Sequence, residues 1–334
     1  MSITISIVSD AWYPQINGVV RTIETLTAEL EKLGHRVSIT EPTGFSSIPC
    51  PSYPEIRLAW CRPSAIARRI GTVRPDAIHI ATEGPLGLAA RRYCVRHAIP
   101  FTTSLHTRFP EYVHARWKIP LSIGYAYLKR FHAPAATVMI STQTLQNELA
   151  ERGFHNLRRW SRGVDTELFR PRSKDVLDAN RPVSLYVGRV AVEKNIEDFL
   201  RLDLPGTKVV VGDGPALGNL RARYPRVRFV GVKTGEDLAT YYAAADVFVF
   251  PSRTDTFGLV MLEALASGVP VAAYPVPGPL DVIGSSGVGV LSHDLLRAAR
   301  EALTIDPRAC RAYAERFSWR RSAEQFLGNI TVVR

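Results

Sequence analysis

Residues 251–264 combine an acidic residue, an aromatic residue and a glycine in an order that favours binding of a phosphorylated sugar. Asp255, Phe257 and Gly258 follow an apolar, strand-like run ending at Phe250. A helix-like run follows them and ends near Gly268. The first amides of a helix lack intrahelical partners and lie at the positive end of its dipole, so they attract phosphate. Gly258 allows an anion to approach the backbone closely.

Two acidic residues accompany these amides. Asp255 is placed to hold sugar hydroxyls, and Glu263, two helical turns further on, is placed to hold a ribose. Leu259 contributes a first-turn amide beside Gly258. The alternative interpretation is a helix capped by Asp255 that carries Glu263 on its surface. This stretch alone leaves both interpretations open.

A second group of polar residues follows another strand-like run. Gly188 and Arg189 leave the run, and Glu193, Lys194 and Asn195 open a helix. Arginine binds phosphate with a planar fork and lysine binds it as a point charge, so Arg189 and Lys194 suit a diphosphate leaving group. A solvated basic turn is the alternative.

Other glycine-rich stretches favour ordinary turns. Gly212 and Gly214 also follow a strand, but Leu217 stands where a dinucleotide-binding pattern needs its third glycine. We therefore interpret Gly212 and Gly214 as a structural turn. A phosphate-binding loop of the Gly-x-x-x-x-Gly-Lys-Ser/Thr type is also absent from the sequence.

The N-terminal half has its own candidates. Asn17 and Gly18 lie at a strand-to-helix turn, a possible anion or sugar site, and His106 follows another strand. His106 is placed to contact a sugar, although a structural histidine is the alternative. The sequence has no His-Glu-x-x-His and no Asp-x-Asp, so we expect no catalytic metal and no cofactor.

Two further stretches mix basic and apolar residues, as the interface of an anionic membrane requires. The first contains Arg68 and Arg69. The second contains Trp117, Lys118, Lys129 and Arg130. The alternative is a solvated helix face next to a core face.

The elements that position these residues alternate between strands and helices. We predict strands at 3–8, 36–40, 77–80, 100–105 and 137–140, with helices at 19–33 and 86–97. After an irregular stretch at 165–182 the pattern restarts, with strands at 183–187, 209–211, 227–230, 247–250 and 269–273 and a helix from about 195. This alternation predicts an α/β protein with two doubly wound parallel sheets facing a ligand cleft at the carboxyl ends of their strands. We expect one domain at 1–168 and another at 169–317.

Composition narrows the class of protein. The chain has 334 residues, 46% of them apolar, and a net charge of +11, which favours an anionic partner. Residues 1–170 hold 21 basic and 13 acidic residues, so most of the excess lies in the first half. We expect reduced thiols at the cysteines, Cys50, Cys61, Cys94 and Cys310, because their spacing fits neither zinc nor redox motifs. We expect no signal peptide and no transmembrane helix.

Taken together, these motifs resemble the retaining, nucleotide-sugar-dependent glycosyltransferases of family four, which have the GT-B fold. The resemblance covers nearly the whole chain and includes stretches at 17–22, 106–107, 162–165, 188–195, 255–263 and 317–319. It is strongest to the sub-group of sulfoquinovosyl-diacylglycerol synthases and glycolipid mannosyltransferases. The family pattern has Glu at the first of two acidic positions eight residues apart, and here that position is Asp255.

The resemblance implies a role for each matching residue. Gly18 would lie near the donor phosphate and His106 would contact the transferred sugar. Arg189 and Lys194 would bind the diphosphate, and Glu263 the nucleotide ribose. Asp255 would hold the sugar with help from the backbone of residues 257–259, with Phe257 and Leu259 flanking Gly258. We therefore predict His106, Arg189, Lys194 and Asp255 as catalytic. The N-terminal domain at 1–168 would bind the acceptor and the C-terminal domain at 169–317 the nucleotide sugar, and a helix at 318–334 would pack back onto the N-terminal domain.

The resemblance also implies an activity. We expect a retaining transferase that moves a hexose or hexuronic acid from a UDP- or GDP-sugar to an acceptor hydroxyl, most readily that of a membrane lipid such as diacylglycerol. Asn17, Arg68, Arg69, Trp117, Lys118, Lys129 and Arg130 would then lie on the acceptor or membrane side. A bacterial, cytoplasmic protein, peripheral on the inner face of the cell membrane, fits this activity.

Three alternatives stay open. They are a transferase of polysaccharide assembly, a nucleotide-sugar epimerase or phosphorolytic enzyme on the same fold, and a basic nucleic-acid-binding module. We expect no nucleic-acid partner, because the sequence shows no helix-turn-helix, zinc finger or aromatic single-strand platform. The sequence predicts no particular oligomeric state.

Overall fold

A computed structural model of the chain describes residues 2–15, 17–50 and 53–333, with only the main chain described at 50, 53–56, 63, 115 and 116. The chain divides into two compact units. Unit 1 comprises residues 1–162 and 319–334, and unit 2 comprises residues 163–318.

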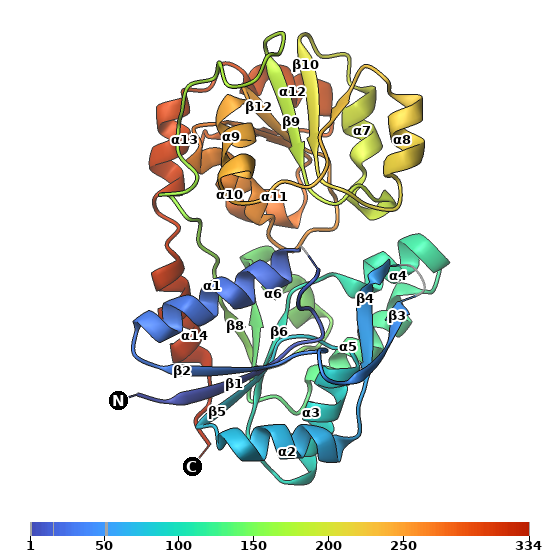
Figure 1. Ribbon diagram of the computed structural model, residues 1–334, viewed down its shortest axis with the longest axis vertical. Helices are drawn as coiled ribbons and strands as arrows, with labels where there is room; N and C mark the ends of the chain where they lie inside the picture. The colour runs from blue at the N-terminus through green and yellow to red at the C-terminus, as the bar shows by residue number, and fades with distance from the viewer. Residues whose placement is uncertain (1, 16, 51–52, 334) are drawn as a thin grey trace. The chain divides into compact units, whose positions relative to one another are not determined.

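Unit 1 is built on a six-stranded parallel sheet in the order β2-β1-β5-β6-β7-β8 (Figure 1). Its strands are β1 (Thr4–Val8), β2 (Arg36–Thr40), β5 (Ala77–Ile80), β6 (Thr102–Leu105), β7 (Thr137–Ile140) and β8 (Leu157–Arg159). An antiparallel hairpin, β3 (Ser46–Cys50) and β4 (Tyr53–Trp60), accompanies the sheet. The helices are α1 (Gly18–Lys32), α2 (Pro63–Val73), α3 (Pro85–Arg96), α4 (Phe109–Trp117), α5 (Leu121–His132), α6 (Gln143–Glu151) and α14 (Trp319–Asn329).

Unit 2 repeats the design with a parallel sheet in the order β11-β10-β9-β12-β13-β14. Its strands are β9 (Val183–Val187), β10 (Thr207–Val211), β11 (Arg228–Phe229), β12 (Val247–Phe250), β13 (Val271–Ala273) and β14 (Gly289–Leu291). The helical segments are a 3-10 turn η1 (Val192–Lys194), α7 (Ile196–Arg201), α8 (Leu217–Arg223), α9 (Gly235–Ala244), α10 (Leu259–Ala266), α11 (Pro277–Val282), α12 (Leu295–Ala302) and α13 (Pro307–Ala314).

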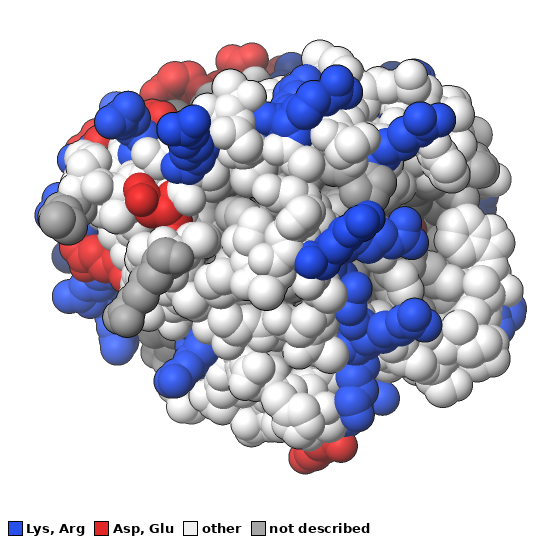
Figure 2. Space-filling model, turned by 90° about the horizontal axis from the view of Figure 1, so that it is seen from below, with Lys and Arg blue, Asp and Glu red and all other residues white. Residues whose placement is uncertain are grey.

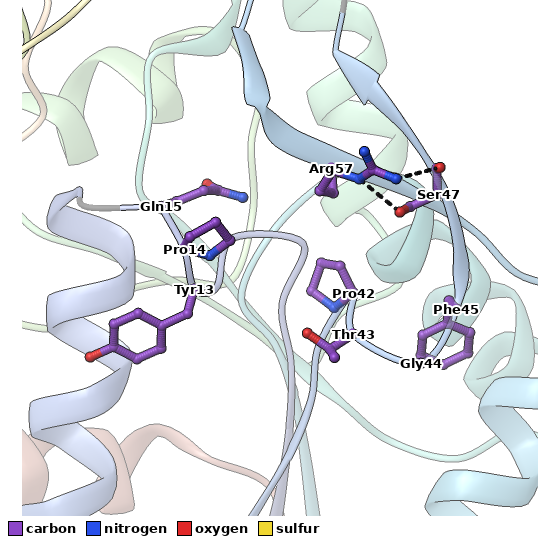
Figure 3. Close-up of a pocket in the computed structure, with 9 residues that line it drawn as sticks. All are labelled: Tyr13, Pro14, Gln15, Pro42, Thr43, Gly44, Phe45, Ser47 and Arg57. Atoms are coloured by element: carbon purple, nitrogen blue, oxygen red, sulfur yellow. Dashed lines mark hydrogen bonds between the residues drawn. The ribbon is translucent and has the colours of Figure 1, made fainter.

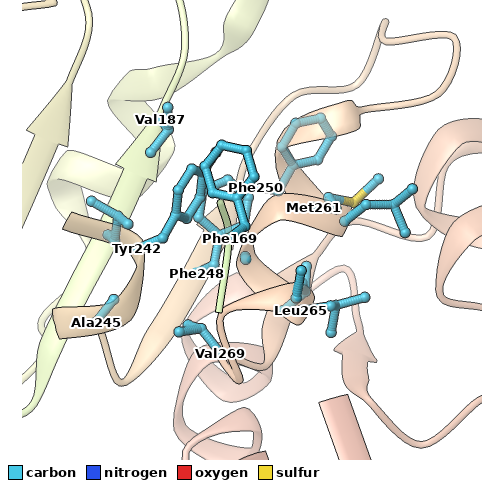
Figure 4. Close-up of a cluster of buried hydrophobic side chains, with 14 of the residues drawn as sticks. Phe169, Val187, Tyr242, Ala245, Phe248, Phe250, Met261, Leu265 and Val269 are labelled. Carbon is cyan, nitrogen blue, oxygen red and sulfur yellow. The ribbon is translucent and has the colours of Figure 1, made fainter. Parts of the chain in front are cut away.

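Every residue of β9 and β12 is buried, as expected of central strands covered on both faces by helices. One face of the unit 2 sheet meets α9 and α10 in a core of large side chains (Figure 4). Phe248 and Tyr242 lie 5.8 Å apart by ring centroid in this core, and Phe169 meets Tyr242 edge to face at 5.5 Å. This packing fixes the strand ends from which the loops of the next section leave.

The predicted α/β fold with two doubly wound parallel sheets is confirmed. The domain boundary differs by six residues, because 163–168 belong to unit 2 rather than to the first domain. Val164 is buried in the unit 2 core, where its amide donates to the carbonyl of Phe317. The assignment of acceptor and donor to the two domains, and the cleft between them, stay predictions.

The last helix, α14, belongs to unit 1. It packs beside α1 (Figure 1). Its Phe326 lies in the same buried cluster as Trp160. The indole Nε1 of Trp160 donates to Oγ of Ser322 at 3.0 Å, and Gln325 accepts from the amide of Ser161 at 2.8 Å. The helix therefore buttresses the end of β8.

Candidate functional site

The two motif loops of unit 2 leave neighbouring strands. β9 pairs with β10 on one side and with β12 on the other, so the sheet reverses its order between β9 and β12. In open α/β sheets, ligands bind beyond the carboxyl ends of the strands at such a reversal. Arg189 follows β9 and Asp255 follows β12, which places both loops at that edge.

Three side-chain contacts hold the two loops together. Nζ of Lys194 lies 2.5 Å from Oδ1 of Asp255. Nδ2 of Asn195 donates to the carbonyl of Pro251 at 3.2 Å, and the Thr254 hydroxyl donates to the carbonyl of Glu193 at 3.1 Å. The structure thus brings together Lys194 and Asp255, which the sequence placed in separate motifs.

The second carboxylate oxygen of Asp255 is notable because it is buried. Within the described part of the chain, Oδ2 accepts no hydrogen bond. A buried carboxylate oxygen without a donor carries a desolvation cost that a ligand hydroxyl can relieve.

The amino end of α10 lies beside Asp255. Gly258 is the residue before the helix, with φ of +86°, and as a glycine it has no side chain with which to cap the first turn. Oδ1 of Asp255 is bonded by Lys194 and Oδ2 accepts no bond from the described residues, so the alternative of an Asp255 cap is wrong. A Cβ on Gly258 would lie 2.7 Å from Cε of Met261 and would need a left-handed backbone, so glycine is required there. Amides at the start of a helix are suited to binding an anion.

Two further predicted residues flank this end. A guanidinium nitrogen of Arg189 lies 3.9 Å from a carboxylate oxygen of Glu193, and the Arg189 side chain is partly exposed. Glu263 lies on α10 with only 5% of its surface exposed, and Oε2 accepts from the Tyr242 hydroxyl at 2.8 Å. The alternative of a surface glutamate at 263 is wrong, because the helix turns this side chain toward α9.

The Gly212–Gly214 turn is explained by packing. A Cβ on Gly212 would lie 1.9 Å from the carbonyl oxygen of Gly188, and one on Gly214 would lie 2.4 Å from that of Val190. The backbone of the loop after β10 thus packs directly against the backbone of the loop after β9. This agrees with the interpretation of Gly212 and Gly214 as a structural turn.

In unit 1, Asn17 caps α1. Its Oδ1 accepts from the amides of Val19 and Val20 at 2.9 and 3.1 Å, and Gly18 is exposed in the first turn. Nδ2 of Asn17 donates to Oε1 of Gln15 at 3.1 Å. Asn17 therefore organises the loop between β1 and α1.

His106 lies at the carboxyl end of β6, also in unit 1. Its Nε2 lies 2.8 Å from Oγ of Ser104, and its Nδ1 lies 3.3 Å from Nη2 of Arg162. Burial, and next the positive charge of Arg162, hold the pKa of His106 well below 6.5. His106 is consequently neutral at pH 7.

A pocket of about 250 Å³ opens in unit 1 where the loops after β1 and β2 meet the β3–β4 hairpin (Figure 3). The guanidinium of Arg57 bonds Ser47 twice in its wall, Nε to Oγ at 3.0 Å and Nη2 to the carbonyl at 2.9 Å. Gln15, which Asn17 holds, also lines it. The loop after β1 was predicted from the sequence as a possible binding site, whereas the hairpin that carries Arg57 was not predicted.

The predicted membrane-side residues lie on two parts of unit 1. Arg68 and Arg69 are exposed on α2. Trp117 and Lys118 are exposed at the end of α4, and Lys129 and Arg130 on α5. Basic side chains outnumber acidic ones on the face of the molecule shown in Figure 2.

Apolar side chains are also exposed on α4, on α5 and on the link between these two helices. Trp117 is 53% exposed, and Phe109, Ile119 and Ile123 are exposed as well. Below them, the Tyr125 hydroxyl donates to Glu111 at 2.5 Å, and Arg108 pairs with Glu148 on α6. This network fixes α4 and α5 against α6. We call the exposed residues of α4, α5 and their link the α4–α5 surface.

Three cysteines, Cys61, Cys94 and Cys310, have free thiols, and the Cys50 side chain lies outside the described residues. Across the described ranges no three His, Cys, Asp or Glu side chains gather as a metal site. No helix within those ranges is long and apolar enough to cross a membrane.

Comparison with known proteins gives two family matches. The model described as "Glycosyltransferase Family 4" matches residues 16–168, and the one described as "Glycosyl transferases group 1" matches residues 181–305. The chain is 30% identical over 317 residues to the sulfoquinovosyl transferase of Arabidopsis thaliana, covering 83% of this chain but only 60% of that relative.

Two bacterial relatives are covered more fully. The GDP-mannose-dependent alpha-mannosyltransferase of Mycobacterium tuberculosis is 29% identical, over 86% of this chain and 83% of the relative. The alpha-monoglucosyldiacylglycerol synthase of Streptococcus pneumoniae is 30% identical, over 91% of this chain and 79% of the relative.

Solved structures share the fold. A sucrose-phosphate synthase from Thermosynechococcus elongatus has a TM-score of 0.77 at 22% identity, covering 98% of both chains. Anabaena HepE in complex with UDP-glucose has a TM-score of 0.72 at 18% identity, again covering 98% of both chains. These likenesses confirm the predicted GT-B fold.

Proposed function

Because the chain belongs to the family-four, group 1 glycosyltransferases, we propose that it transfers a hexose or hexuronic acid from a UDP- or GDP-sugar to an acceptor hydroxyl with retention of configuration. The observation that carries this proposal is the edge of unit 2, where a buried oxygen of Asp255 that accepts no bond from the described residues lies beside the amino end of α10. A sugar hydroxyl and a phosphate are complementary to those two features.

The leaving group is a nucleoside diphosphate. Arg189 and Lys194 neutralise its developing charge, and the amides at Gly258 and Leu259 add hydrogen bonds and the helix dipole. Such preorganised charges account for much of the rate of an enzyme, because they need no reorganisation during the reaction. We expect the reaction to proceed without a metal ion.

Asp255 takes the donor sugar in this proposal. Oδ1 is held by Lys194, so Oδ2 keeps a fixed direction toward the ligand. The ion pair with Lys194 thus orients the side chain of Asp255, which is shorter than the Glu of the family pattern. Glu263 binds the ribose, and the Tyr242 hydroxyl orients its carboxylate.

Retention follows if the acceptor hydroxyl attacks from the face that the diphosphate leaves. The departing phosphate oxygen takes the proton of the attacking hydroxyl, so the glycosidic bond forms as the sugar–phosphate bond breaks. His106 is neutral and lies at the end of β6, where it contacts the sugar rather than supplying a proton.

The proposed acceptor is a membrane lipid such as diacylglycerol. The names of two relatives, a sulfoquinovosyl transferase and an alpha-monoglucosyldiacylglycerol synthase, support glycolipid formation. The pocket beside Gln15 and Arg57 suits a polar headgroup. The α4–α5 surface presents tryptophan, isoleucine, lysine and arginine side chains, the combination that binds an anionic lipid surface. A cytoplasmic, peripheral membrane location follows.

One assay tests the proposal. The purified chain is incubated with a panel of UDP- and GDP-sugars, either alone, with a lipid extract or with soluble saccharides, and the products are identified by mass and anomeric configuration. Formation of an α-linked glycolipid from an α-linked donor supports the proposal. A product on soluble saccharide alone indicates polysaccharide assembly, and conversion of the donor without acceptor indicates an epimerase.

A further inference from the structure

Arg162 is a buried arginine that has no acidic partner within the described residues. Its side chain is 4% exposed, and its Nη1 donates to the carbonyls of Trp160 and Ser161 at 2.7 and 3.1 Å. The guanidinium lies over the Trp160 ring, 4.0 Å from the centroid. Burial lowers its pKa to about 9, so it is a cation at pH 7. An unpaired buried cation is costly, which calls for a reason beyond packing.

The remaining contact of Arg162 is His106, to which Nη2 donates at 3.3 Å. Guanidinium groups only donate, so Nδ1 of His106 must be the acceptor. A neutral imidazole with Nδ1 as acceptor carries its proton on Nε2. The Nε2–H then donates to Oγ of Ser104 at 2.8 Å.

The hydrogen-bond directions continue through the core of unit 1. The Ser104 hydroxyl has one proton to donate, and two acceptors lie within reach: the carbonyl of Ala81 at 3.4 Å and Nε2 of His79 at 3.1 Å. The shorter contact, to His79, continues the chain. Nδ1 of His79 then donates to Oγ1 of Thr102 at 2.9 Å. Phe326 of α14 packs edge to face on His79 with centroids 5.0 Å apart, so this chain of bonds is enclosed. Arg162 fixes the direction of the bond from His106 to Ser104, because a guanidinium can only donate.

We propose that Arg162 is a positioning residue that holds His106 neutral, in the Nε2–H tautomer and in one ring orientation, at the end of β6. The inference rests on the proposed glycosyl transfer, in which His106 meets the donor sugar. Because both ring nitrogens are engaged by Arg162 and Ser104, His106 meets a sugar as a fixed neutral ring and takes no part in proton transfer. Among the groups that face the ring are Arg162, Ser104, Trp160 and, through Ser104, His79.

The test reads the tautomer directly. In protein carrying ¹⁵N-labelled histidine, long-range ¹H–¹⁵N spectra should show His106 in the Nε2–H form, without titration, from pH 8 down to pH 5.5. Arg162→Met removes the donor and the charge but leaves the burial that lowers the pKa of His106 most, so we expect mixed tautomers and a pKa that rises toward 6.5 but stays below it. Arg162→Lys keeps a charged donor and should restore one tautomer. Unchanged spectra in folded Arg162→Met would overturn the proposal.

Ser104→Ala provides a second variant in case Arg162→Met fails to fold. It removes the partner of Nε2 and leaves Arg162 in place, so the Nε2–H tautomer should persist. A switch to the Nδ1–H form in Ser104→Ala would show that Ser104, rather than Arg162, decides the tautomer.

Kinetics tie the tautomer to transfer. In Arg162→Met we expect kcat to fall about 100-fold, as for a misplaced group, with little change in the donor KM and a new acid inflection in the pH profile. Arg162→Lys should recover most of kcat. A purely structural Arg162 would lower the melting temperature and leave the pH profile unchanged. The spectra need no substrate, so failure of the proposed function appears separately, as absent transfer by the wild-type protein.

Discussion

Replacing Lys194 by Met tests the proposed donor site most directly. The variant keeps the length of the side chain and removes its charge. In the wild-type protein Nζ lies 2.5 Å from Oδ1 of Asp255, and each side chain is 19% exposed. Oδ2 of Asp255 accepts no bond from the described residues, so the variant leaves the carboxylate without its ion-pair partner.

The expected effect has two parts. At an effective dielectric constant near 20, unit charges at this separation attract by roughly 6 to 7 kcal/mol, most of which offsets the cost of removing them from water. Breaking a fully buried pair costs about 3–5 kcal/mol, and the partial exposure here reduces the loss of unfolding free energy to about 1–3 kcal/mol. Loss of one charged hydrogen bond to the leaving diphosphate costs about 1.5–3 kcal/mol, so kcat/KM should fall about 10- to 150-fold.

Lys174→Met is the matched control. Nζ of Lys174 lies 2.7 Å from Oδ1 of Asp246, a lysine–aspartate pair just before β12, whereas Asp255 follows that strand. Asp246 keeps Arg181 and the amide of Val183 as partners. We expect a stability loss below about 1 kcal/mol and unchanged kcat/KM.

The assay measures product by mass at saturating acceptor and varied donor, well below the melting temperature of each variant. Equal kcat/KM for Lys194→Met and Lys174→Met would refute the assignment of Lys194 to the diphosphate. A lower melting temperature of Lys194→Met together with wild-type turnover would show that the Lys194–Asp255 pair has only a structural role.

Further expectations follow from other contacts. Gly258→Ala forces a left-handed alanine against Met261, so thermal unfolding should show a loss of about 1–2 kcal/mol, whereas Gly218→Ala on the exposed face of α8 should be neutral or stabilising. Tyr242→Phe removes the bond to buried Glu263 and should cost about 1–3 kcal/mol in denaturant titrations. Burial, and next the charge of Arg162, lower the pKa of His79 to about 3, so the contribution of neutral His79 to the free energy of unfolding is full above pH 6.5 and is lost as the pH falls toward 3. Urea unfolding should therefore show about 1.4 kcal/mol of stability lost per pH unit over that range. A stability that does not change with pH there would contradict this expectation. Binding to anionic vesicles should weaken as the salt concentration rises, and it should be weaker for Trp117→Ser than for the wild-type protein. The control Arg221→Gln on α8 should bind as the wild-type protein does. Equal binding to neutral and anionic vesicles would remove the support for a membrane acceptor.

Much of the fold was predictable because strand and helix signals are local. Runs such as Val183–Val187 and Val247–Phe250 are apolar throughout, and their alternation with helices requires parallel sheets. The β3–β4 hairpin was missed, because Pro49 weakens the strand signal of its first strand. The pocket that the hairpin forms with the loops after β1 and β2 was therefore missed as well.

The sequence by itself was enough to select the residues that we propose for the donor site. Gly258, Asp255 and Glu263 are spaced along one loop and one helix, so their relation depends only on local geometry. Lys194 and Arg189 could be assigned to phosphate by type, but no local pattern pairs Lys194 with Asp255, 61 positions away.

The tertiary structure decided that pairing, because β9 and β12 are neighbours in the sheet although β10 and β11 separate them in sequence. It likewise decided the place of Arg162, whose contact with His106 exists because β6, β7 and β8 align their carboxyl ends. Hydrogen bonding and periodicity act over a few residues, whereas the order of strands in a sheet depends on the packing of the whole unit. The residue types were therefore readable from the sequence, but the partners that orient them were not.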